Sequence, residues 1–227
     1  ITSNLTANDI KVYINGVEIT CDKELTQTGS GKTINYALKL ANVLESGKAS
    51  IKVASGKITD SIGNTNSEKT ITPGITFDNI KPTISFTPNE ETRYLQNLTS
   101  VIDVVDNETG VDDSTIKYIV STNSNATPNT QIGNGGQITI KDVTGHYYII
   151  GYACDYAGNC NTGISGIYNM NNSGPGIEIT PTGNTGYAKS ADIKIKVTQN
   201  GTALDEGSFV YTISTDSNAT PDKTFIN

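Results

Sequence analysis

Apolar and polar residues alternate with a period of two along most of the chain. The alternating segments are residues 100–106, 115–121, 137–143, 146–154, 191–199 and 208–214. They are rich in Val, Ile, Thr and Tyr and are bounded by Gly, Asn, Pro or Asp, which is typical of half-buried β-strands. Residues 35–47 carry a partly helical pattern. We interpret them as a strand plus a connection, because "DVTG" at 142–145 occupies the matching place before the next strand.

The same sequence returns at a fixed distance. "STNSNATPNT" at 121–130 recurs as "STDSNATPDK" at 214–223. The tyrosines that precede the two copies are 93 residues apart (211 − 118), and two prolines further upstream have the same spacing (175 − 82). One register kept over such a length identifies an internal repeat of domain size. A partial copy lies upstream, where "ITDSIGNTN" at 58–66 matches "ACDYAGNCN" at 153–161.

The repeat predicts three units, at residues 1–78, 79–172 and 173–227. About seven short strands per complete unit indicate a sandwich of two antiparallel sheets. The linkers at 77–82 and 169–175 are polar, rich in Asn and contain Pro, so adjacent units should stack with limited swing. By alignment, the first unit begins after its first two strands and the third stops before its last strands. We therefore expect the chain to be part of a longer array.

A short hairpin with two cysteines stands out in the middle unit. "DYAGN" at 155–159 has the pattern of a three-residue loop, with its glycine in the left-handed position of a bulge. That register places Cys154 opposite Cys160 in a non-hydrogen-bonded pair, whose Cα atoms lie about 4.5 Å apart. We predict a structural disulfide between them. The same places in the first unit hold Thr59 and Thr65, a cross-strand threonine pair.

At these motifs the chain resembles the bacterial immunoglobulin-like repeats of secreted and wall-attached Firmicutes proteins. The resemblance is carried by "KPTISF" (81–86), "IKYIVST" (116–122), "GHYYIIGYACDYAGNC" (145–160) and "ITDSIGNTNSEKTITPGITFDN" (58–79), and it covers essentially the whole chain. It implies tandem immunoglobulin-like Greek-key sandwiches that pack on neighbouring repeats of the same chain. It also implies an extracellular location, on the bacterial surface or secreted, which agrees with a disulfide.

The charge of the chain excludes one class of partner. The net charge is −7 and the chain has 16 Lys and Arg against 23 Asp and Glu. Nucleic-acid binding needs clustered basic residues, so we expect no nucleic-acid partner. No run approaches the roughly 18 apolar residues of a membrane-spanning helix, so we expect none in this sequence.

The sequence offers little for catalysis. His146 is the only histidine, and we expect it to be solvated at the start of a strand with no triad to join. We therefore predict no enzyme activity and no cofactor. One loop, "DNETGVDDS" at 106–114, could supply oxygen ligands for Ca²⁺ from Asp106, Glu108, Asp112 and Asp113. The alternative is a solvated loop, because the third unit has Gln and Gly at the places of the first two acids.

One strand has large apolar residues on its outer face. Tyr148, Ile150 and Tyr152 point outward when the strand is counted back from Asp155. They either contact a host glycan or matrix protein or are covered by a loop. We predict a non-catalytic structural spacer of a bacterial surface protein, a stalk or adhesin. The alternatives are a ligand-binding module and accessory domains of a secreted glycoside hydrolase or protease.

Overall fold

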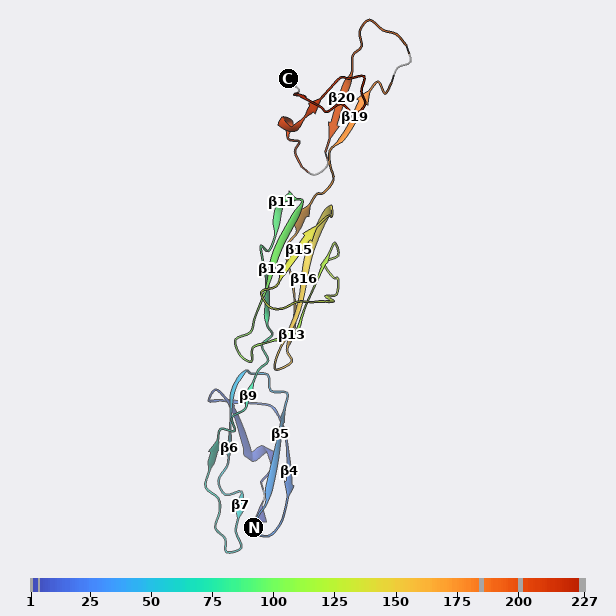
Figure 1. Ribbon diagram of the computed structural model, residues 1–227. Coiled ribbons are helices and arrows are strands. Elements are labelled where there is room, and N and C mark those ends of the chain that lie inside the picture. The colour runs from blue at the N-terminus through green and yellow to red at the C-terminus, as the bar shows by residue number, and fades with distance from the viewer. Residues whose placement is uncertain (1, 4, 184–185, 200–201, 225–227) are drawn as a thin grey trace.

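The computed structural model describes residues 2–3, 5–183, 186–199 and 202–224. Strands dominate this part of the chain, and its helical residues form the short 3₁₀ turns η1 (Ala7–Asp9) and η2 (Glu206–Ser208). The strands gather in three groups that follow one another in a row (Figure 1). We call these groups the first, second and third unit. The prediction of an all-β fold built from antiparallel sheets is confirmed. No helix within the described residues is long and apolar enough to span a bilayer.

The first unit consists of short strands around a small core. Its strands are β1 (Thr2–Ser3), β2 (Ile10–Ile14), β3 (Val17–Ile19), β4 (Asp22–Thr28), β5 (Asn35–Ala41), β6 (Gly47–Val53), β7 (Ile58–Thr59), β8 (Lys69–Ile71) and β9 (Thr76–Phe77). One sheet has the order β3-β2-β6-β8 with β9 added on β6, and β4–β5 and β1–β7 form separate pairs. Ile14, Val43 and Ala49 are buried together, and Phe77, the first residue of the segment 77–82, packs against them.

The second unit is a sandwich of two sheets. Its strands are β10 (Thr83–Thr87), β11 (Glu91–Leu95), β12 (Asn97–Val105), β13 (Val111–Ser121), β14 (Thr130–Gln131), β15 (Gln137–Lys141), β16 (Gly145–Asp155), β17 (Cys160–Ile164) and β18 (Tyr168–Met170). One sheet is β10-β12-β15; the other is β11-β18-β16-β13-β14 with β17 on β16. Their inner faces enclose one core, in which Ile102, Ile116, Ile149 and Tyr168 are completely buried.

The third unit contains β19 (Gly176–Thr180), β20 (Lys194–Thr198), β21 (Val210–Tyr211) and β22 (Lys223–Thr224). The β19–β20 pair repeats the register of β10–β12. Ile177 lies opposite Val197, as Ile84 lies opposite Val104, and each residue of the later pair follows its counterpart in the earlier pair by 93 positions (177 − 84 and 197 − 104). The internal repeat of the sequence is thus also a repeat of strand pairing.

Two segments show how local conformation and hydrogen bonding determine where a strand begins or ends. Residues 35–41 form β5, and Asn42 then takes a positive φ of 53°, which ends the strand and begins the connection. The alternating segment 208–214 yields only β21, Val210–Tyr211. Asp205 accepts hydrogen bonds from the Gly207 and Ser208 amides and folds the segment before β21 into a 3₁₀ turn. This local capping shortens the strand that alternation alone predicts.

Candidate functional site

The linker between the first two units is bonded to both of them. The side-chain amide of Asn79 donates to the main-chain oxygens of Val43 (3.0 Å) and Glu45 (3.2 Å) in the first unit. In the second unit, the side-chain amide of Asn159 donates to the main-chain oxygen of Asp78 (3.0 Å). Adjacent linker residues are therefore held from opposite sides.

The second linker repeats the first of these contacts. Asn172 follows Asn79 at the repeat distance (172 − 79 = 93), and its side-chain amide donates to the main-chain oxygens of Gln96 and Val143, both at 2.8 Å. An asparagine amide has two N–H donors, and both copies use them on backbone carbonyls of the preceding unit. The Asn-rich linkers of the sequence thus contain a repeated clamp.

Three carboxylates meet at the first junction. Asp78 follows β9, Asp106 follows β12, and Asp155 ends β16. One oxygen from each lies within 4.8 Å of the other two. Asp78 belongs to the linker, whereas Asp106 and Asp155 belong to the second unit. The cluster therefore spans the boundary between the linker and the second unit.

Asp155 is held in place by the turn that it starts. It is 3% exposed. Its Oδ1 accepts the Asn159 amide N–H at 2.8 Å, and its Oδ2 accepts the Asn159 side-chain amide at 2.7 Å. Asp60 and Asn64 make the same two contacts in the first unit, at 2.9 and 2.8 Å. This repeated pair fixes where the Asp155 carboxylate points.

Asp106 has one satisfied oxygen and one unsatisfied oxygen. Its Oδ1 accepts three backbone N–H groups of its own turn, from Glu108 (3.2 Å), Thr109 (3.0 Å) and Gly110 (2.8 Å). Its Oδ2 is buried and has no hydrogen-bond partner. Oδ1 is thus occupied by the turn, and Oδ2 is the oxygen left without a partner. A buried oxygen without a partner is costly, and this one is an ionisable carboxylate oxygen.

Asp78 is bonded to the second unit through its side chain. Its Oδ2 accepts the Thr109 hydroxyl at 2.6 Å, and its Oδ1 accepts the Ile80 amide N–H at 2.9 Å. Desolvation acts to raise the pKa of Asp78, but these hydrogen bonds outweigh it and lower the pKa below its ordinary value. Asp78 is therefore ionised at neutral pH and brings a negative charge to the cluster.

Among the described residues, no basic side chain forms an ion pair with the carboxylates of this cluster. The ion pairs found there join lysines or Arg93 to other acids, as in Lys57–Asp9, Lys52–Glu68 and Arg93–Glu91. Asp78, Asp106 and Asp155 belong to none of them. Like charges this close repel one another unless a cation or a proton lies between them.

The structure groups the acids differently from the set expected within the loop. Of the four predicted residues, Asp106 alone belongs to a cluster suited to a metal ion within the described chain. Glu108 and Asp113 are exposed. Asp112 lies in β13, where its Oδ1 accepts the amide and hydroxyl of Ser114. Glu108 lies in the turn before β13, and Asp112 and Asp113 lie at the start of that strand, outside the cluster.

The hairpin at 154–160 contains the expected cross-link. Cys154 and Cys160 are opposite each other in β16–β17 and form a disulfide with Cα atoms 4.0 Å apart. In the first unit, Thr59 and Thr65 form an antiparallel bridge at the same place. Cys21 is a free, half-buried thiol against the core of the first unit, and desolvation raises its pKa.

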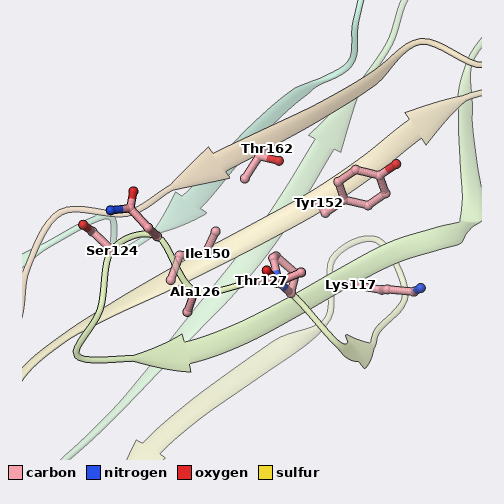
Figure 2. Close-up of a pocket in the computed structure, with 9 residues that line it drawn as sticks. Lys117, Ser124, Ala126, Thr127, Ile150, Tyr152 and Thr162 are labelled. Atoms are coloured by element: carbon pink, nitrogen blue, oxygen red, sulfur yellow. The ribbon is translucent and has the colours of Figure 1, made fainter.

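The outer face of β16 is partly covered by the recurring loop. Ile150 is only 2% exposed. The loop lies over it, with Ala126 next to Ile150 in Figure 2. An open groove of about 650 Å³ remains between this loop and Tyr152, with Lys117 of β13 and Thr162 of β17 as flanking residues. Of the two alternatives predicted for this face, a ligand contact or a covering loop, the structure places a loop over Ile150.

The remaining predicted residues lie away from the carboxylate cluster. Tyr148 and Tyr152 are half-buried on β16. The Tyr152 hydroxyl lies 3.2 Å from the Cys154 sulfur. His146 is exposed, and its Nδ1 lies 2.6 Å from the Asn169 side-chain oxygen. This histidine thus contacts a side-chain amide, which is not a nucleophile that an imidazole could activate.

Comparisons with known proteins add little to this picture. No protein-family model and no curated protein matches the sequence. Among solved structures, the fibronectin(III)-like modules of Clostridium thermocellum CbhA match with 15% identity and a TM-score of 0.33, over 75% of this chain and 81% of theirs. The all-β fold therefore rests on the strand pairing described above.

The sequence did not single out Asp78 as a functional residue. It lies in the segment 77–82, which the sequence predicts to be a linker. The repeat offers one signal, because Asp78 corresponds to position 171 of the second linker (171 − 78 = 93). The second linker has the neutral Asn171 at that position, so the negative charge is particular to the first junction.

Proposed function

We propose that the chain is a non-catalytic spacer of an extracellular bacterial protein, part of a stalk or adhesin. The observation that carries the proposal is the linker pair: Asn79 bonds back to the first unit, and Asp78 bonds forward to the second. Hydrogen bonds on both sides restrict bending at the junction. Units joined in this way form a semi-rigid rod, which suits a spacer.

Two further features support the proposal. A disulfide such as Cys154–Cys160 persists in oxidising surroundings, which favours a location outside the cytoplasm. The single histidine is exposed, and its Nδ1 contacts the side-chain amide of Asn169, which is not the nucleophile of a catalytic triad.

Small-angle scattering of the whole chain, and of an N79A variant, tests the spacer role. We expect the wild type to fit one extended conformer with the arrangement of Figure 1. The N79A variant should need a broader ensemble, because the clamp on Val43 and Glu45 is gone. N125A, in a surface loop of the second unit, is the matched control. A wild type that scatters as a compact particle or as freely jointed beads would refute the proposal.

A second candidate function, binding of a glycan or host protein, rests on the groove beside Tyr152. An aromatic ring next to hydroxyl and amide groups suits a polar ligand. The double variant Y148S/Y152S would lose binding on a glycan array or to matrix proteins if this face is used. Unchanged binding would remove this candidate.

The same spacer could serve a secreted glycoside hydrolase or protease. The DNA on either side of the segment that encodes these residues separates these settings. Further units and a wall-sorting signal favour a surface stalk, whereas an adjoining catalytic domain makes the units its spacer.

A further inference from the structure

We propose that Asp78, Asp106 and Asp155 bind a divalent cation of the Ca²⁺ class at the junction of the first two units. One oxygen of each lies within 4.8 Å of the other two. Ca²⁺ holds its oxygen ligands at about 2.3–2.6 Å, so ligands on opposite sides of one ion are separated by about 5 Å. The three carboxylates thus lie within the span of a single coordination sphere.

The unpartnered oxygen of Asp106 is the independent sign of a ligand. Oδ2 is buried and accepts no hydrogen bond, whereas Oδ1 is fully used by the turn. The turn therefore orients Oδ2 rigidly before any ion arrives. A hard cation satisfies this oxygen and removes the repulsion among three carboxylates that no described ion pair relieves.

The origin of the ligands favours Ca²⁺ over Mg²⁺. They come from a linker, a loop after β12 and the end of β16, and each of them already accepts a hydrogen bond from a neighbouring residue. Mg²⁺ demands near-ideal octahedral geometry and releases its water reluctantly, whereas Ca²⁺ accepts irregular shells completed by water. Three carboxylates with water fit an affinity of about 0.1–1 mM, as in other extracellular calcium modules.

The repeat makes this site particular to the first junction. The positions 93 residues further on hold Asn171 and Gln199 in place of Asp78 and Asp106. Gln199 donates a hydrogen bond to the Ser173 main-chain oxygen at 2.8 Å, so a neutral contact joins the second linker to the third unit. Cation binding goes beyond the spacer role, and it is measured without reference to the shape of the molecule.

Binding is tested on the whole chain after treatment with a chelator. Calorimetric titration with CaCl₂ should give one saturable site, and Tb³⁺ should give luminescence sensitised by Tyr156, which follows Asp155 in the sequence. The D106N variant keeps an acceptor for the turn N–H groups but loses the charged Oδ2, so affinity should fall at least about tenfold. E108Q removes an exposed acid of the same loop and should bind within about twofold of the wild type.

D78N is the second variant, because it leaves the turns of the second unit intact. It should weaken binding as D106N does. No saturable binding of Ca²⁺ or Tb³⁺ up to about 5 mM would overturn the proposal. Equal loss in E108Q and D106N would overturn it too, since that result indicates diffuse attraction to an acidic loop.

Discussion

At the scale of single residues, Asp9 shows how a surface carboxylate depends on its neighbours. Its Oδ1 lies 2.7 Å from the Lys57 ammonium. Its Oδ2 accepts the Thr6 hydroxyl at 2.7 Å and the Thr6 amide at 2.9 Å. The Lys57 contact foremost, and then those from Thr6, lower the pKa of Asp9 from its ordinary 3.8 to about 2. This pair links η1, directly before β2, to the segment before β7.

This pKa predicts a pH dependence of the first unit. Because the folded pKa lies below the unfolded one, the stabilisation is present above pH 3.8 and is lost as the pH falls towards 2. The K57M variant keeps the apolar stem but loses the charge. We expect its Asp9 pKa, followed by NMR, to rise towards the ordinary value. Its unfolding midpoint should lie below that of wild type at pH 6 and approach it at pH 2.5.

K48M is the control, because Lys48 is an exposed lysine of β6 outside the ion pairs described here. It should leave the Asp9 titration unchanged. An identical Asp9 pKa in wild type and K57M would show that the Thr6 contacts alone lower it.

At the scale of elements, two glycines let the sheets of the second unit approach. Gly151 of β16 lies opposite Gly163 of β17. A Cβ on Gly163 would lie 2.7 Å from the Ile84 Cβ, and one on Gly151 would lie 3.0 Å from the Ile102 Cδ1. The paired glycines therefore leave room for β10 to pack across this part of the sandwich.

This close packing predicts that adding one methyl group at Gly163 lowers the stability of the second unit. Gly163 has no positive φ, so G163A is compatible with the backbone and acts through its methyl group alone. Displacing Ile84 should destabilise the second unit by about 1–3 kcal/mol, measured by urea unfolding. G133A adds a methyl group where nothing lies within 4 Å, and should change the stability by less than about 0.5 kcal/mol. Equal effects of the two changes would show that close packing is not the cause.

The disulfide gives a second prediction for the same unit. It closes a loop with a sequence separation of 6. On the chain-entropy model so short a loop contributes about 2 kcal/mol. The C154A/C160A variant should lower the unfolding free energy by that amount, and reduction of the wild type should give a similar shift. A midpoint unchanged in both would show that the strand pairing alone holds the hairpin.

The alternation of apolar residues predicted strand β16 well, whereas a loop over its outer face was only one of the two alternatives that the sequence left open. The period of two correctly places Ile149 and Ala153 in the core. The same period places Ile150 on the other face, yet Ile150 is 2% exposed because the loop around Ala126 lies over it. Periodicity reports the face of a strand, whereas burial also depends on loops that pack back from elsewhere in the chain.

At the scale of the whole molecule, the spacing of 93 residues recurs in the strand pairing of β10–β12 and β19–β20, but it did not predict the carboxylate cluster. Asp78, Asp106 and Asp155 are separated by 28 (106 − 78) and 49 (155 − 106) residues. Only the chain path through the junction brings them together. The sequence pattern predicted ligands within the single loop 106–114, and that loop contributes one of the three carboxylates of the cluster. Sites at domain boundaries depend on how units stack, which local spacing does not encode.

The two junctions should therefore respond differently to Ca²⁺. Exchange of backbone amides in 76–82, 106–110 and 155–159 should slow when the cation binds, because opening of the first junction then requires its release. At a tenfold excess over the dissociation constant the exchange should slow by about tenfold. The second linker, residues 169–175, has neutral residues at the matching positions and should exchange at the same rate with and without Ca²⁺. Hydrogen–deuterium exchange with mass spectrometry measures both linkers in one sample, so each serves as the reference for the other. Equal protection of the two linkers would indicate a general effect of the ion on the chain and would contradict a cation held at the first junction.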